Sequence, residues 1–176
     1  MEIIKVFWFF LPAGVANMAP VFAKYLHLPP TPIDLGKKLG GKPIFGPHKT
    51  YRGLELGILL AIGTAYLQKS LAPHTTSFNL VDYSQINIWQ LSLLQGFGAL
   101  AGDLVKSFLK RRLAKASGQP WPPFDQLDWI VGAVILSSLL VNLSTAQILI
   151  ALLLFGGLHP LVNLAGYSLR IKNNRF

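Results

Sequence analysis

The sequence predicts an all-α, polytopic membrane protein with five transmembrane helices, an N-terminus outside and a cytoplasmic C-terminus. Apolar residues make up 52% of the 176 residues and only 13% are charged, with a mean hydropathy of +0.45. A soluble domain carries about 25% charged residues, so a membrane protein is favoured. Long apolar runs recur along the chain, and two segments rich in basic residues separate them. Because cysteine is absent, the sequence excludes disulfides, zinc–thiolate sites and a cysteine nucleophile.

Five apolar segments are the expected spans, at residues 3–26, 53–71, 86–104, 129–141 and 146–169. A helix needs about 20 residues to cross a hydrocarbon core of about 30 Å, so the fourth is short unless it begins near Phe124. Pro12, Pro20 and Pro160 lie inside the first and fifth segments, where we expect kinks. The first segment continues to Leu26 and further spans follow. We therefore interpret it as a retained helix, with a cleaved signal peptide as the alternative.

The basic residues determine the predicted orientation. With the N-terminus outside, fourteen of the sixteen Lys and Arg residues fall on the cytoplasmic side, and only Lys5 and Lys69 fall outside. The opposite orientation reverses this ratio, so the positive-inside rule favours the first, and five spans place the C-terminus inside. No linker or repeat divides the chain. We expect a single membrane-embedded domain over residues 1–176, with cytoplasmic loops at about 27–52 and 105–128. In a membrane protein, a net charge of +9 indicates anionic lipids or substrates, and we expect no nucleic-acid partner.

The second cytoplasmic loop begins with charged residues on one helical face. If the helix of the third span continues past the membrane, at about 100° per residue, four of its side chains lie on one face that spans about 60° on either side of Asp103. These residues are Asp103, Lys106, Ser107 and Lys110. Arg111 borders this face and Arg112 points elsewhere. An aspartate with lysines three and seven residues later can hold a metal ion and the phosphates bound to it. The alternative is an i,i+3 ion pair with solvated positive charge. Because Asp103 lies close to membrane depth, where charge is costly, a functional role is favoured.

Two further aspartates follow a rigid proline segment. Pro120-Trp121-Pro122-Pro123 cannot be helical throughout and redirects the chain. Asp125 and Asp128 then open the fourth span. N-capping is the structural alternative for one of them, but it does not account for both together with Asp103. Carboxylates from neighbouring helices suit Mg²⁺, a hard cation that prefers oxygen ligands.

The first cytoplasmic loop combines glycines with basic residues, in the sequence TPIDLGKKLGGKPIFGPHKTYRG at residues 31–53. Glycines allow the backbone to approach a ligand closely, and five basic side chains supply positive charge, so phosphate binding is a natural use. A flexible, positively charged loop is the alternative. A P-loop is excluded, because Pro47 and His48 separate Gly46 from Lys49.

Two blocks of these loops resemble a known family. The first block is Pro32-Ile33-Asp34-Leu35-Gly36-Lys37 with Gly46 and Lys49-Thr50-Tyr51-Arg52-Gly53, and the second runs from Gly102-Asp103 through Lys106-Ser107, Lys110-Arg111-Arg112 and Pro120 to Asp125 and Asp128. Both resemble the archaeal CDP-archaeol synthase family, a relative of bacterial and eukaryotic CDP-diacylglycerol synthases. The likeness covers essentially the whole chain. The family commonly has Arg at the position of Thr31, and an acidic residue and Gly near Pro47 and His48.

The resemblance implies a CTP-dependent cytidylyltransferase. It would convert 2,3-bis-O-geranylgeranylglycerol 1-phosphate and CTP to unsaturated CDP-archaeol and pyrophosphate, at the cytoplasmic side of the cell membrane. Its implied catalytic residues are Asp103, Asp128 and Lys106, and its implied Mg²⁺ ligands are Asp103, Asp125 and Asp128. The residues expected to bind substrate are Asp34, Lys37, Lys49, Thr50, Arg52, Lys106, Ser107, Lys110 and Arg111. The alternatives are a small ion channel or transporter and a non-catalytic membrane subunit. The sequence leaves the oligomeric state open.

Overall fold

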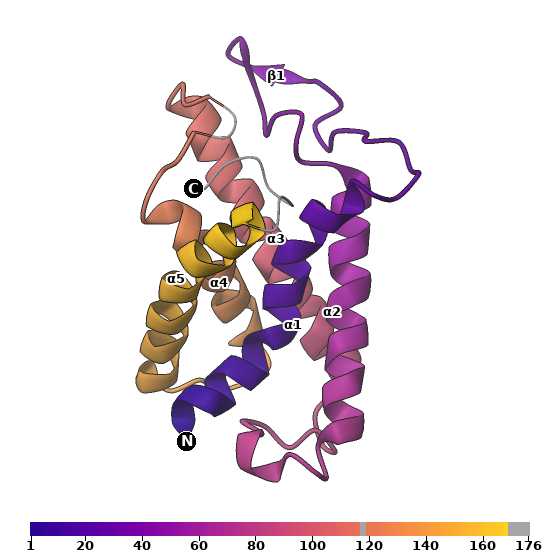
Figure 1. The fold of residues 1–176 in the computed structure, drawn as a ribbon, viewed down its shortest axis with the longest axis vertical. Coiled ribbons are helices and arrows are strands. Elements are labelled where there is room, and N and C mark those ends of the chain that lie inside the picture. Colours follow the sequence, from indigo (N-terminus) through magenta and orange to yellow (C-terminus); the bar gives the residue numbers. More distant parts are fainter. Residues whose placement is uncertain (117–118, 169–176) are drawn as a thin grey trace.

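The structure, a computed structural model, describes residues 1–116 and 119–168 as a bundle of helices (Figure 1). Within these residues there are five α-helices: α1 (Glu2–Ala23), α2 (Tyr51–Leu71), α3 (Ile88–Arg112), α4 (Phe124–Ser137) and α5 (Thr145–Ser168). The loops between α1 and α2 and between α3 and α4 lie at one end of the bundle. The short 3₁₀ helix η1 (Thr76–Phe78) and the N-terminus lie at the other end (Figure 1). The predicted cytoplasmic C-terminus, with Arg170, Lys172 and Arg175, lies outside the described residues.

The helices follow the predicted apolar segments, with one clear difference in α4. This helix begins at Phe124 and ends at Ser137, earlier at both ends than the segment 129–141. Pro122 and Pro123 precede it, and proline is well tolerated at a helix start, where the missing N–H has no intrahelical partner to lose. Asp125 lies in the first turn, where the positive end of the helix dipole favours a carboxylate. The extended α3, which continues to Arg112, carries the charged face beyond the predicted third span.

The expectation of an all-α chain needs one correction, because the first loop contains a β-hairpin. Strands β1 (Lys38–Leu39) and β2 (Lys42–Pro43) pair antiparallel, with Leu39 opposite Lys42. Gly40 and Gly41 form the turn, with φ values of +56° and +76°. Two-residue turns with positive φ at both positions match the twist of a hairpin, and glycine adopts this backbone conformation without strain.

Two buried glutamines satisfy the backbone of α1 near its first proline. Pro12 has no N–H, so the carbonyl of Trp8, four residues earlier, loses its usual helical partner. Gln68 of α2 donates its amide Nε2–H to that carbonyl, and Gln95 of α3 donates to the next one, Phe9 O, at 2.8 Å. Both glutamine side chains are fully buried. The carbonyls of α1 near Pro12 are therefore served by polar side chains from α2 and α3. Helix α1 is bent along its length (Figure 1).

Replacing Gln95 by leucine is expected to destabilise the bundle by about 1 kcal/mol, because the buried hydrogen bond from its amide to the Phe9 carbonyl, which joins α3 to α1, would be lost. Thermal unfolding in detergent should show a lower midpoint for Gln95→Leu. The matched control is Gln90→Leu, which changes an exposed glutamine on the same helix and should unfold like the wild type. Equal midpoints for the two variants would show that the Gln95 hydrogen bond contributes nothing measurable.

Helices α3 and α4 approach each other through glycines that face one another. A Cβ atom at Gly98 would lie 2.6 Å from the carbonyl oxygen of Gly132, and one at Gly102 would lie 2.1 Å from that of Asp128. On the other helix, a Cβ atom at Gly132 would lie 2.1 Å from Gly98 O. Small residues at this spacing allow two helical backbones to pack in direct contact, as they do in membrane proteins. The contact fixes the position of Asp128 relative to α3.

An aromatic cluster joins α1, α4 and α5 in the core. The ring of Phe155 in α5 packs edge-on against Trp129 of α4 at a centroid distance of 5.1 Å, and against Phe10 of α1 at 6.4 Å. All three side chains are buried. Edge-to-face pairs of this kind add about 0.5–1.5 kcal/mol beyond the area that they bury. The cluster therefore holds α4 against the rest of the bundle below its charged first turn.

Much of the outer surface of the bundle is apolar. Large side chains such as Leu59 of α2, Ile135 of α4 and Leu153 of α5 face outward and are more than half exposed. Among the described residues, α1 and α5 are long and apolar enough to cross a membrane, judged by length and composition alone. Such an outward apolar surface is uncommon in soluble monomers.

Candidate active site

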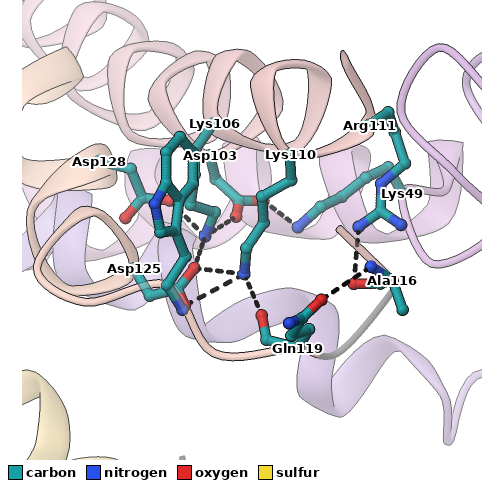
Figure 2. A network of polar contacts seen from close by, with 10 residues as sticks. Lys49, Asp103, Lys106, Lys110, Arg111, Ala116, Gln119, Asp125 and Asp128 are labelled. Atoms are coloured by element: carbon teal, nitrogen blue, oxygen red, sulfur yellow. Dashed lines mark hydrogen bonds and ion pairs between the residues drawn. The ribbon is translucent and has the colours of Figure 1, made fainter. Parts of the chain in front are cut away.

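Three aspartates converge on the ammonium group of one lysine at the loop end of the bundle (Figure 2). Lys106 Nζ lies 3.0 Å from Asp103 Oδ1, 2.6 Å from Asp128 Oδ2 and 3.4 Å from Asp125 Oδ1. Asp103 and Lys106 come from α3, and Asp125 and Asp128 come from the first two turns of α4. The side chain of Asp128 is only 5% exposed. The structure thus brings together the carboxylates for which the sequence predicts a shared site.

Two more lysines complete the charge balance of this cluster (Figure 2). Lys49, from the first loop, forms an ion pair with Asp103. Lys110 Nζ lies 2.7 and 3.1 Å from the two oxygens of Asp125, and it also donates to the carbonyl of Gln119 at 2.6 Å. Three carboxylates therefore face three ammonium groups. Buried charges of this kind are tolerated only when they are paired and hydrogen-bonded.

Asp125 also orders the chain that leads into α4. Its Oδ2 atom accepts a hydrogen bond from the backbone N–H of Trp121, within the proline segment. This contact differs from an N-cap, since the residue at the N-cap position is Pro123 and makes no side-chain cap. Lys110 holds Asp125 and the carbonyl of Gln119 together, so it anchors the second loop as well as contributing charge.

Asp34 organises the first loop. Its carboxylate accepts hydrogen bonds from the backbone N–H groups of Phe45 and Gly46, both at 2.9 Å, and of Gly36 at 3.0 Å. Burial raises the pKa of Asp34, but the three N–H donors outweigh it and hold the pKa below its usual value. The residue predicted to bind substrate therefore shapes the loop around the hairpin, with both of its oxygens used by the backbone.

Exchanging Asp34 for asparagine should loosen this loop at neutral pH, because an amide has a single uncharged acceptor oxygen. We expect hydrogen exchange at Phe45 and Gly46 to be about tenfold faster, the effect of losing about 1.4 kcal/mol. A depressed pKa stabilises the folded loop above the unfolded value of about 3.9, and this stabilisation is lost as the pH falls through the folded pKa. The difference between wild type and variant should therefore narrow in acid. Asp82→Asn, at the opposite end of the bundle, is the control and should leave both amides unchanged.

The remaining predicted residues are placed differently. Thr50 caps α2, since its Oγ1 accepts from Gly53 N at 3.4 Å. Arg52 donates to the carbonyls of Leu26 and Leu28 and so holds the segment after α1 to the start of α2. It does not join the carboxylate cluster. Arg111 donates to Ala116 O at 3.3 Å across the second loop. Ser107 is buried on α3, and Lys37 is exposed beside the hairpin.

The donor set of the cluster fits a divalent cation in its chemistry. Asp103, Asp125 and Asp128 offer carboxylate oxygens, which are the ligands that Mg²⁺ prefers, and they already surround one positive charge, the Lys106 ammonium. Among residues 1–116 and 119–168, no three acidic or histidine side chains form a ready-made metal site. In this arrangement the Lys106 ammonium lies among the three carboxylates and balances their charge.

An apolar groove reaches the cluster from between α3 and α4. It encloses about 550 Å³, and its walls include Phe97, Val131 and Ile135. Lys106 and Asp128 line its charged end. A second, much smaller cavity of about 20 Å³ lies between the first loop and α3, beside Lys49 and Asp103. The charged cluster therefore borders the apolar groove on one side and the small cavity beside the first loop on the other.

Comparison with known proteins shows the family to which the sequence is similar. The profile of the family described as "CarS-like: CDP-archaeol synthase" matches residues 1–176. A CDP-archaeol synthase of Methanosphaerula palustris is 38% identical over 150 residues, which cover 81% of this chain and 88% of the relative. The CDP-archaeol synthase of Pyrobaculum arsenaticum is 35% identical, with 98% of each chain covered.

A solved structure resembles the fold closely. It is described as "an intramembrane enzyme for archaeal membrane lipids biosynthesis", and it superposes with a TM-score of 0.74 at 31% identity. The match covers 90% of this chain and 92% of the other. Both the sequence and the fold thus agree over nearly the full length, and the chain belongs to the CDP-archaeol synthase family.

Proposed function

We propose that this protein is a CTP-dependent cytidylyltransferase that makes unsaturated CDP-archaeol and pyrophosphate from CTP and 2,3-bis-O-geranylgeranylglycerol 1-phosphate. The observation that carries the proposal is the cluster of three carboxylates and three lysines at the mouth of an apolar groove. Charged groups suited to a triphosphate and a groove suited to prenyl chains meet at one place. Family membership supports the same activity and does not favour a channel, a transporter or a non-catalytic subunit.

We further propose that all five helices cross the membrane as one domain, with the N-terminus outside and the C-terminus cytoplasmic. The outward apolar side chains of α2, α4 and α5 support this topology. The basic loop 24–50 and the last turn of α3, with Lys110, Arg111 and Arg112, lie together at one end of the bundle (Figure 1), as the positive-inside rule requires of cytoplasmic segments. The active site would then face the cytoplasm, where CTP is available.

The reaction is an in-line transfer at phosphorus. An anionic oxygen of the lipid phosphate attacks the α-phosphorus of CTP, a new P–O bond forms, and the bond to the β-phosphate oxygen breaks to release pyrophosphate. Because the attacking oxygen is already ionised near neutral pH, no general base is needed. Catalysis then depends on positioning the two phosphates and on neutralising their charge.

The chain's own lysines would supply much of that neutralisation. Lys106 lies between the three aspartates and at the end of the groove, so its ammonium can reach phosphates from either substrate. Lys49 brings positive charge from the first loop to the same point. Lys110 would keep Asp125 in place, Arg111 and Lys37 would extend the positive surface towards the triphosphate, and Ser107 would offer its hydroxyl to a phosphate oxygen. Thr50, Arg52 and Asp34 would hold the first loop in position.

We propose Mg²⁺ as the cofactor, held by Asp103, Asp125 and Asp128. When bound there, the ion would neutralise triphosphate oxygens and make the α-phosphorus more electrophilic. Lys106, which now balances these carboxylates, would then be free to bind phosphate. The prenyl chains would lie in the groove between α3 and α4, whose apolar walls exclude water from them.

The direct test uses the purified protein in detergent with labelled CTP, Mg²⁺ and the prenylated glycerol phosphate. We expect equal amounts of CDP-lipid and pyrophosphate, no product after EDTA treatment, and recovery when Mg²⁺ is returned. The absence of any CTP-dependent product with every prenylated glycerol phosphate tried would overturn the proposed function. Product formation that EDTA leaves unchanged would overturn the metal assignment alone.

A further inference from the structure

The hydrogen bonds that join the basic hairpin β1–β2 to α3 centre on one arginine. The strand residues of the hairpin are all exposed, so no apolar side chain anchors it. Arg112, at the end of α3, donates from its guanidinium to three hairpin carbonyls: those of Leu39, Lys42 (3.1 Å) and Pro43 (2.5 Å). In return, Lys42 Nζ donates to the carbonyl of Arg112 at 3.1 Å. These hydrogen bonds join segments about seventy residues apart in the chain.

The arginine is oriented for this role by its own helix. Its guanidinium lies over the ring of Phe108, one turn earlier, at 5.2 Å from the ring centroid. Stacking on an aromatic face fixes the plane of the fork, and a planar fork with five N–H donors suits several carbonyls better than an ammonium does. The Lys42 contact adds a positive charge at the negative end of the α3 dipole, which is favourable.

The docked hairpin concentrates like charges. The hairpin segment carries Lys37, Lys38 and Lys42, and the end of α3 carries Arg111 and Arg112, which follow the ion-paired Lys110. Backbone carbonyls accept hydrogen bonds without neutralising any of these charges. Coulombic repulsion therefore opposes docking, and an anion that lies between the two segments would relieve it. Docking and polyphosphate binding should consequently favour each other, as linkage requires.

We propose that Arg112 is a positioning residue that docks the basic hairpin onto α3, so that the hairpin brings its positive charge close to the triphosphate, and that triphosphate binding favours the docked state. The inference rests on the proposed function for the identity of the triphosphate. Arg112 itself acts through the hairpin carbonyls and need not contact substrate. The helical phase of α3 directs Arg112 away from the Asp103 face, towards the hairpin.

The position of the hairpin can be measured without activity. Because the chain has no cysteine, spin labels can be placed at Leu39→Cys and Leu67→Cys, two exposed positions on the hairpin and on distant α2. Pulsed electron–electron distance measurements should give a narrow distribution in the otherwise wild-type protein and a broad one with Arg112→Ala. Inorganic tripolyphosphate should narrow the broad distribution. A narrow distribution in the Arg112→Ala protein would overturn the proposal.

Kinetics provide the second readout. Arg112→Ala should raise the KM for CTP by about tenfold, with a smaller change in kcat, as expected for the loss of one or two charge-assisted hydrogen bonds. Arg112→Lys should fall between, because it keeps the charge and loses the fork. Lys115→Ala removes a nearby basic side chain that lies over Trp121, and it should match the wild type in both readouts.

The outcomes separate two possible failures. An undocked hairpin with an unchanged KM for CTP would show that docking does not position the triphosphate, which overturns the proposal. An equal rise in KM for Lys115→Ala would also overturn it, since the effect would then be one of net charge. If the wild type makes no CDP-lipid at all, the proposed function fails, while the distance distributions with tripolyphosphate still decide whether Arg112 docks the hairpin.

Discussion

Asp103→Ala is expected to lower CDP-lipid formation by about 10³-fold, which corresponds to about 4 kcal/mol of transition-state stabilisation. Asp103 is the carboxylate at which the two loops meet, because it pairs with Lys49 of the first loop and with Lys106 of its own helix. Its removal would leave both ammonium groups without their shared partner and would take away one proposed Mg²⁺ ligand. The measurement is the kcat/KM for labelled CTP in protein that elutes as a single folded species.

Asp82→Ala is the matched control for this prediction. Asp82 is an aspartate at the opposite end of the bundle, where it accepts hydrogen bonds from Ser84 and Gln85. Its loss should leave kcat/KM within about twofold of the wild type, as is usual for a surface substitution away from the site. Near-normal CDP-lipid formation by a folded Asp103→Ala protein would contradict the assignment of Asp103 to the site.

A double-mutant cycle distinguishes a metal ligand from a partner in an ion pair. If Asp103 acts only through Lys49, the Lys49→Ala variant should lose as much activity, and the double variant should lose no more. If Asp103 also holds Mg²⁺, Lys49→Ala should cost far less than Asp103→Ala. The Mg²⁺ concentration required for half-maximal activity should then rise in Asp103→Asn, which keeps the shape of the side chain and loses its charge.

Gly102→Ala is expected to destabilise the fold by about 3 kcal/mol and to reduce activity with it. The added Cβ would lie 2.1 Å from the carbonyl oxygen of Asp128, and a backbone atom cannot rotate away as a side chain can. Helices α3 and α4 would have to separate, which would draw Asp128 away from Lys106. Thermal unfolding in detergent and kcat/KM measure the two effects.

Gly63→Ala is the control for the intrinsic effect of replacing glycine in a helix. Gly63 lies within α2, and a Cβ there would meet nothing within 4 Å. Alanine is favoured over glycine in a helix interior by about 1 kcal/mol, so this variant should be as stable as the wild type or more so. Equal unfolding midpoints for Gly102→Ala and Gly63→Ala would show that the α3–α4 contact is looser than the structure has it.

The family could be predicted from the sequence, and so could the end of the bundle at which the charged residues gather. Apolar runs indicated the helices, and helical phase placed Asp103, Lys106 and Lys110 on one face of α3. These inferences succeed because a helix relates residues three, four and seven apart by local geometry alone. The sequence analysis gave the start of α4 near Phe124 only as the condition under which the fourth span would be long enough. It did not predict the hairpin, although Gly40-Gly41 is a recognised turn signal.

The partners across helices were decided by tertiary structure. Composition could not distinguish Arg52, which ties the segment after α1, from Lys49, which reaches Asp103. Nor could it show that Gln68 and Gln95 serve the carbonyls near Pro12. The Gly98-x-x-x-Gly102 spacing indicates a close helix–helix contact in the sequence. The sequence does not show that the partner of this motif is Gly132 of α4.

The sequence by itself therefore determined the helices, the charged face of α3 and the family, because these depend on local periodicity and on motifs. Tertiary structure alone decided that three aspartates share one lysine and that Arg112 holds the hairpin. Which charge meets which depends on the rotation and depth of one helix against the next. Backbone contact at Gly98, Gly102 and Gly132 sets both for α3 and α4, and that contact joins residues about thirty positions apart.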